Sequence, residues 1–206
     1  MPTPLTLVWA AIGVILTALG TLWQWTLPIP TLETYRFSLQ LGGVFLTACL
    51  GGSLAGFYAQ VGYVALGLSG IPIFSYGGGW DYVQQPAFGY LLGFIPGAWV
   101  CGWFACPPLG LGVRRRRRPR LWAGCLLGLA VIHGVGWVGL LLRWGWDVWD
   151  YGWRYSLYPL PGQLLVIGLV VVVTFCYRRL TFHETSPGAK RLASRRPANL
   201  RSLGRE

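Results

Sequence analysis

Long stretches without a charged residue constrain the fold of this chain more than any other feature. Residues 5–25, 37–80, 82–113, 121–142 and 155–177 contain no Asp, Glu, Lys or Arg. Only 11% of the chain is charged, whereas soluble domains average about 25%. A helix needs about 20 predominantly apolar residues to cross a bilayer, and soluble core helices do not stay uncharged for so long. The sequence therefore predicts an all-α, polytopic membrane protein.

Turn-forming residues divide these stretches into spans. Residues 37–68 exceed the length of one span, and Gly51, Gly52 and Ser53 offer a tight break within them. We expect six transmembrane helices, near residues 5–25, 38–50, 54–69, 88–107, 121–142 and 160–177. Residues 5–25 are expected to be a span and not a signal peptide, because no Lys or Arg precedes them and no small-residue cleavage site follows.

The basic residues predict the orientation of these spans. Two clusters, residues 114–120 and the tail 178–206, contain 14 of the 17 basic residues. Six spans place both clusters on one side, and basic residues favour the cytoplasmic side. We expect both termini to be cytoplasmic, with residues 1–177 as the transmembrane domain and 178–206 as a basic, disordered tail. The arginine run is expected to meet anionic membrane lipids, not nucleic acid.

Residues that bind metals or carry out catalysis are sparse. The five cysteines form no CxxC pair, and neither histidine lies near another type of ligand in the sequence. We therefore expect no metal and no cofactor. His133 is expected to hydrogen-bond a neighbouring helix. No Ser/His/Asp spacing, paired-carboxylate motif or phosphate-binding loop is present, so we expect a protein that is not an enzyme.

Small residues recur at intervals that favour close helix packing in lipid. The fourth span carries Gly89, Gly93 and Gly97, and the fifth begins with Gly124 and Gly128. We expect these glycines to pack inside the protein. The first span has its own small residues, which we interpret as a candidate docking surface for another subunit: Ala10, Ala11 and Gly13.

Amides and aromatic residues gather where the predicted topology places the outer face. Gln40 begins the second span, Gln84 and Gln85 precede the fourth, and Gln163 begins the sixth. Aromatic residues are frequent in segments 74–90 and 144–158. An apolar pocket with a few placed polar groups is typical of a small-molecule site, and amides suit a ligand with a urea, amide or carbonyl group.

An aromatic belt at the lipid interface is the alternative for these segments. Both interpretations stay open for residues 144–158. For residues 70–90 we favour the site, because Gly-rich, Pro-broken backbone in an uncharged region is tolerated where it is buried in protein or lines a cavity.

One long segment resembles a known family. GGSLAGFYAQVGYVALGLSGIPIFSYGGGWDYVQQPAFGYLLGF, residues 51–94, is similar to the central signature of the BioY family, the biotin-specific S components of energy-coupling-factor (ECF) vitamin transporters. SLQLGGVFLTACLGG upstream and PLPGQLL downstream extend the similarity. The matching positions in the central segment are Gly56, Gln60, Tyr63, Gly67, Gly70, Pro72, Phe74, Pro86, Gly89, Tyr90, Leu91, Gly93 and Phe94.

The resemblance implies an S-component-like bundle in the bacterial plasma membrane that captures biotin from outside. Its implied partners are a transmembrane coupling subunit and two ABC-type ATPases, and it contacts membrane lipids but no nucleic acid. The substrate-binding residues that we expect are Gln40, Phe74, Gly78, Trp80, Gln85, Tyr90, Tyr158 and Gln163.

Two departures from the family pattern bear on the ligand. Gln163 and Val166 stand where the family has an Asp and a Lys that contact the vitamin. Gln163 can still supply an acceptor for the ureido N–H groups. Arg36, Arg143 or Arg154 can replace the lysine, or the ligand carboxylate can stay hydrated. The alternatives are an S component for another small vitamin or amphiphile, and a membrane scaffold or assembly protein without a ligand.

Overall fold

The computed structural model describes residues 2–27, 35–105, 118–145 and 148–183. The chain forms two units, Met1–Val171 and Val172–Glu206. The described part of the second unit is the C-terminal portion of helix α7, in which the Arg179 guanidinium lies 5.3 Å from the centre of the Phe175 ring. The predicted domain boundary at 177/178 stays a prediction.

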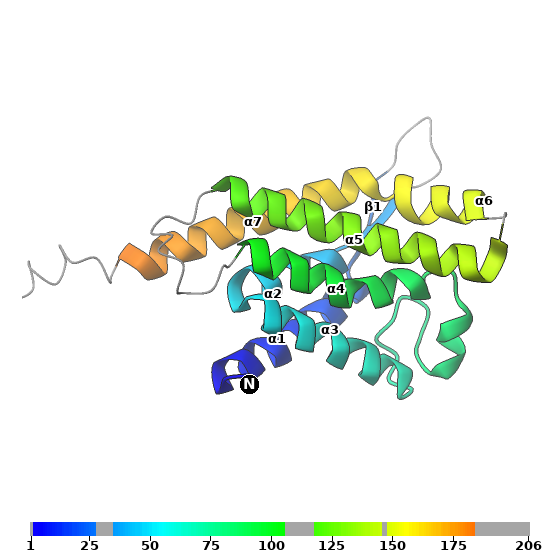
Figure 1. Ribbon diagram of the computed structural model, residues 1–206, viewed down its shortest axis with the longest axis horizontal. Helices are drawn as coiled ribbons and strands as arrows, with labels where there is room; N and C mark the ends of the chain where they lie inside the picture. Colours follow the sequence, from blue (N-terminus) through cyan, green and yellow to red (C-terminus); the bar gives the residue numbers. More distant parts are fainter. Residues whose placement is uncertain (1, 28–34, 106–117, 146–147, 184–206) are drawn as a thin grey trace, which may run out of the picture. The chain divides into compact units, whose positions relative to one another are not determined.

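Helices form nearly all of the described structure (Figure 1). They are α1 (Pro4–Leu22), α2 (Gln40–Gly51), α3 (Ser53–Leu68), α4 (Phe88–Ala105), α5 (Arg118–Trp144), α6 (Val148–Gly152) and α7 (Leu160–His183). A 3-10 helix, η1 (Trp80–Gln84), precedes α4, and a π-helical turn, η3 (Trp153–Leu157), precedes α7.

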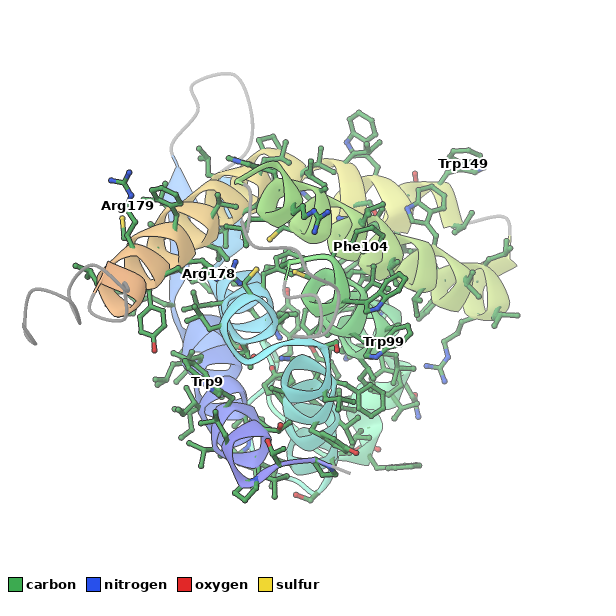
Figure 2. The ribbon with its side chains drawn as sticks, turned by 60° about the vertical axis from the view of Figure 1, so that its left-hand side comes forward. Trp9, Trp99, Phe104, Trp149, Arg178 and Arg179 are labelled. Carbon is green, nitrogen blue, oxygen red and sulfur yellow. The ribbon has the colours of Figure 1, made fainter. Side chains whose placement is uncertain are left out.

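Within the described ranges, four stretches are long and apolar enough to cross a membrane: Pro4–Leu22, Phe88–Ala105, Arg120–Trp144 and Val148–Leu180. Two shorter apolar helices, Gln40–Gly51 and Ser53–Leu68, coincide with the expected second and third spans. The chain is a multi-pass membrane protein. Figure 2 shows the exposed side chains of Trp99 and Trp149 projecting outward from the ribbon.

The predicted break between the second and third spans is confirmed. Gly52 separates α2 from α3 and has a φ of 90°, a left-handed conformation that only glycine adopts without strain. The break allows the backbone to reverse and lets Gly56 of α3 pack on α2, because a Cβ at Gly56 would lie 3.1 Å from the Ala48 Cβ.

A short hairpin joins α1 to α2 and was not expected from the sequence. Strands β1 (Gln24–Leu27) and β2 (Tyr35–Ser38) pair antiparallel, with Gln24 opposite Ser38 and Leu27 opposite Tyr35. The first span consequently ends at Leu22 and not at residue 25. Aromatic and β-branched residues favour strands where the chain leaves the helix.

Near the C-terminus, α7 continues past residue 177, where the sequence predicted the last span to end. Arg178 and Arg179 therefore lie on the helix, and cations near the C-terminus of a helix are favourable.

Glycines bring α4 and α5 into close contact along their length (Figure 1). A Cβ at Gly93 would lie 2.8 Å from the Ile132 carbonyl oxygen, and one at Gly128 would lie 2.8 Å from the Gly97 carbonyl oxygen. Gly89 likewise meets the backbone of Gly136. The prediction of internal packing is therefore confirmed for these glycines, and the physical reason is van der Waals contact between backbones.

The interpretation of the first-span small residues as a docking surface is wrong for two of the three. Ala10 and Gly13 are buried, and a Cβ at Gly13 would lie 2.7 Å from the Ala59 Cβ of α3. Only Ala11 is exposed. The small residues of α1 allow it to approach its own bundle, so the surface that α1 presents outward consists of larger apolar residues such as Val8, Ile12 and Ile15.

Candidate functional site

Two networks of buried and half-buried polar side chains join the helices. The first centres on the Tyr63 hydroxyl of α3, which donates to the Ile73 carbonyl oxygen at 2.9 Å and accepts from Gln40 Nε2 of α2 at 3.0 Å. The Thr21 hydroxyl of α1 lies 3.0 Å from the same oxygen. Tyr63 has no exposed surface. These bonds pair a buried hydroxyl that would destabilise the fold if it had no partner.

A loop, residues 70–79, folds back over the end of α3 and covers this network. Phe74 and Gly77 exchange backbone hydrogen bonds of 2.9 and 3.1 Å, and the Gly79 N–H donates to the Gly67 carbonyl oxygen at 2.7 Å. The Phe74 ring occupies the space that a side chain at Gly67 would need. Glycine at position 67 therefore fixes where the loop can lie on the helix.

Aromatic rings continue from the first network into η1. The centre of the Phe74 ring lies 5.4 Å from that of Tyr63 and 4.6 Å from that of Tyr82. Burial raises the pKa of Tyr82 far above its ordinary value, and the nearby hydroxyls of Tyr63, Tyr76 and Tyr155 raise it further. The Arg143 guanidinium at the end of α5 donates to the Val83 carbonyl oxygen and ties η1 to that helix.

The second network centres on Ser156, in the π-helical turn before α7. Its Oγ lies 2.7 Å from the Tyr90 hydroxyl, 2.9 Å from Trp137 Nε1 and 3.0 Å from His133 Nδ1. His133 Nε2 in turn lies 2.9 Å from Gln163 Oε1. The network therefore joins α4, α5, η3 and the first turn of α7. It also confirms that His133 hydrogen-bonds neighbouring helical segments.

Hydrogen-bond valence determines the direction of every bond in the second network. An amide oxygen only accepts, so His133 Nε2 carries the hydrogen and neutral Nδ1 accepts. The single Ser156 hydrogen then goes to His133 Nδ1. The indole N–H of Trp137 only donates, and Tyr90 must also donate to Ser156, which uses both serine lone pairs.

These bond directions show which group of Gln163 is available to a ligand. Its Oε1 accepts from His133, so the amide is held with a defined orientation, and the two Nε2 hydrogens are the donors it can offer to a ligand. Gln40 has the opposite polarity, since its Nε2 donates to Tyr63 and its Oε1 is the acceptor it can offer. Helices α2 and α7, which carry Gln40 and Gln163, are in contact near these amides: a Cβ at Gly42 would lie 3.4 Å from Val166 Cγ1.

The eight residues expected from the sequence divide into three groups. Gln40, Phe74 and Tyr90 are buried, and the first and third belong to the two networks. Tyr158 and Gln163 are half-buried. Those on the surface are Gly78, Trp80 and Gln85.

The structure gives one of the surface residues a packing role. A side chain at Gly78 would collide with the Ile71 carbonyl, so Gly78 allows the loop to close on itself. Trp80 is 74% exposed and belongs to the outer surface of η1.

Sequence reasoning missed four residues that organise the site: Thr21, Tyr63, Trp137 and Ser156. Tyr63 stood within the recognised motif, where a buried hydroxyl in an apolar helix was a usable signal. No sequence signal pointed to Ser156, since it lies among aromatic residues in segment 144–158, for which the sequence left two interpretations open. Its position depends on the π-helical turn, in which the Tyr158 N–H donates to the Trp153 carbonyl oxygen five positions earlier, at 3.0 Å.

Comparison with known proteins agrees with these observations. The sequence model of the BioY family matches residues 3–182. A "Probable biotin transporter BioY" from Lysinibacillus sphaericus is 44% identical over 131 residues, covering 64% of this chain and 62% of that protein. The "Biotin transporter BioY" of Thermotoga maritima is 36% identical over 125 residues, covering 59% and 68%.

Two further similarities cover most of the chain. An "Uncharacterized 21.2 kDa protein in psbX-ycf33 intergenic region" from Cyanophora paradoxa is 30% identical over 184 residues, covering 84% of this chain and 95% of that protein. A crystal structure described as the S-component for biotin from an ECF-type ABC transporter superposes with a TM-score of 0.67 at 20% identity, covering 84% and 90%. The fold is thus that of an S component, and the chain belongs to the BioY family.

Proposed function

We propose that this chain is the substrate-capturing membrane subunit of an ATP-driven vitamin importer and that its substrate is biotin. Membership of a transporter family supports this role, in which the subunit binds and moves a molecule without changing its bonds. The observation that carries the proposal is the pair of hydrogen-bonded amides, Gln40 in the first network and Gln163 in the second. They provide a defined acceptor and a defined donor.

The two amides match the polar part of biotin, whose ureido ring carries N–H donors and a carbonyl acceptor. Gln40 Oε1 is suited to accept from a ureido N–H, and Gln163 Nε2 is suited to donate to the ureido carbonyl. The expectation that Gln163 supplies an acceptor stays a prediction beside this assignment, because its Oε1 keeps a second lone pair. Phe74, Tyr82 and Tyr90 supply apolar ring faces beside these groups.

The remaining expected residues complete the proposed site. Trp80 begins η1 and Gln85 directly follows it, so both can close over a bound ligand. Tyr158 lies five positions before Gln163. Val166 cannot replace a lysine, since it is apolar and buried against α2. Arg143 is the cation that the structure ties to η1, so we assign it to the carboxylate end of the ligand.

The wider assembly follows from the same proposal. The subunit works with a transmembrane coupling subunit and two ABC-type ATPases, and transport is a shift between two orientations driven by ATP use in those partners. It lies in the bacterial plasma membrane with both termini in the cytoplasm, as the two arginine-rich clusters favour.

Binding of radiolabelled biotin to the detergent-purified protein tests the proposal. Gln40→Ala and Gln163→Ala should each weaken binding about 10- to 100-fold, since a lost hydrogen bond to a buried group costs about 1–3 kcal/mol. Gln24→Ala, which removes an exposed amide from β1, is the matched control and should bind as wild type.

The other outcomes separate the alternatives. If the protein binds a different vitamin saturably and does not bind biotin, the S-component role stands and the proposed substrate is wrong. The change of substrate would then be explained by Gln163 and Val166, which stand where the family has an Asp and a Lys. Folded protein that binds no vitamin of a broad panel would refute the capture role and leave a scaffold protein.

A further inference from the structure

Three thiols from three helices meet in the core of the bundle, away from both amide networks. Cys49 of α2, Cys101 of α4 and Cys125 of α5 have no exposed surface. Each of the three pairs of sulfur atoms is separated by 3.8 Å. A disulfide would require about 2.05 Å, so the sulfurs are in van der Waals contact without being bonded to one another.

The sulfurs form an equilateral triangle that matches one central atom. The centre of a triangle with sides of 3.8 Å lies 3.8/√3, about 2.2 Å, from each corner. An atom with three bonds of roughly 2.3 Å to these sulfurs therefore lies about 0.7 Å out of their plane, as a pyramidal atom with a lone pair does. Close packing holds the triangle in place: a Cβ at Gly128 would lie 3.0 Å from the Cys101 Cβ and 2.9 Å from Phe45 Cε1. Little rearrangement of the helices is needed to bind an atom at the centre.

Charge decides which kind of atom fits. The surroundings are apolar, with Phe45, Ala48 and Ala98 buried in the same core. A net charge in such a place is costly. Three thiolates around Cu⁺ would leave two negative charges, and around Zn²⁺ one, while Zn²⁺ also favours a fourth ligand. A trivalent thiophile with three thiolates is neutral and uses three ligands.

Two of the three cysteines lie near the ends of their helices. Cys49 lies two positions before the end of α2 at Gly51, and Cys101 lies four positions before the end of α4 at Ala105. At about 1.5 Å per residue, the sulfurs lie on the order of one turn below these ends. An uncharged reagent such as arsenous acid can cross that depth without the cost of moving a charge.

We propose that Cys49, Cys101 and Cys125 form a binding site for trivalent arsenic. Arsenous acid, As(OH)₃, reacts with the three thiols. Three As–S bonds form and three As–O bonds break. Each leaving hydroxyl takes one thiol proton and departs as water, and neither arsenic nor sulfur changes its oxidation state. The product is a neutral cross-link between α2, α4 and α5, so its formation should stabilise the fold and restrict relative motion of these helices.

The test uses the full chain with Cys106→Ser and Cys176→Ser, which leaves the three clustered cysteines as its only thiols. Arsenite is added to this reduced, detergent-purified protein. Intact mass spectrometry should show one added arsenic atom and the loss of three hydrogen atoms. X-ray absorption at the arsenic edge should find three sulfur neighbours. The midpoint temperature of unfolding should rise because three thiols already placed together in the folded form bind arsenic more tightly than the same thiols in the unfolded chain.

Replacing any one clustered cysteine should weaken arsenite binding roughly 100-fold, because the third bond forms at a high effective concentration. Cys125→Ala is the first choice, with Cys49→Ala and Cys101→Ala as repeats. The absorption measurement needs none of these variants, so the proposal stays testable if they do not fold. It would be overturned by folded protein that takes up no arsenic, by arsenic with fewer than three sulfur neighbours, or by unchanged binding in Cys125→Ala.

Discussion

Ser156→Ala should destabilise this protein more than any other removal of a single oxygen atom from the second network. The Ser156 hydroxyl accepts from Tyr90 and Trp137 and donates to His133, so its loss leaves three side chains without that partner. Hydrogen bonds between transmembrane helices average about 0.6 kcal/mol and reach about 1.7. Three such bonds predict a decrease of about 2–5 kcal/mol in the free energy of unfolding.

The assay is reversible unfolding in mixed detergent micelles, followed by tryptophan fluorescence. Ser69→Ala is the matched control, because the exposed Ser69 hydroxyl donates only to the Leu66 carbonyl oxygen in the described structure. It should change stability by less than about 0.5 kcal/mol. A double-mutant cycle with Tyr90→Phe should give a coupling energy of about 0.5 kcal/mol or more. Ser156→Ala with the stability of Ser69→Ala, or a coupling of zero, would refute the assigned network.

Three further predictions concern the rest of the site. Tyr63→Phe removes the hydroxyl that pairs with Gln40 and Ile73, and should lower unfolding free energy by about 1–3 kcal/mol, measured in the same micelles against Tyr58→Phe, an exposed tyrosine on the same helix. Gly67→Ala places a methyl group against the Phe74 ring and should displace residues 70–79; limited proteolysis should then cut this loop faster, and wild-type cleavage rates would contradict the packing. Arg143→Met keeps an unbranched, flexible side chain but removes the donor to Val83, so biotin binding should weaken about tenfold. Arg154→Met changes an exposed arginine before α7 and should leave biotin binding unchanged.

The positions of the spans were predictable because lipid imposes them. Uncharged length, the Gly52 break and the glycine spacing at Gly93 and Gly97 are local properties of the sequence, and hydrocarbon tolerates few alternatives to a packed helix. The amide at Gln40 and the aromatic residue at Phe74 were likewise identified from their positions in the chain. The exception was the β1–β2 hairpin, because a few strand-forming residues at the end of an apolar run do not distinguish a hairpin from the last turn of a helix.

The chemistry of the interior required the tertiary structure. Cys49, Cys101 and Cys125 are far apart in sequence and meet only because α2, α4 and α5 pack together. The orientation of the Gln163 amide shows only in its contact with His133, 30 positions away in the sequence, and His133 in turn contacts Ser156 of another segment. The sequence by itself determined which segments lie in lipid, since burial of apolar residues there depends on composition. Hydrogen bonds and thiol contacts depend on distances of a few ångströms between separate helices, and only packing decided those.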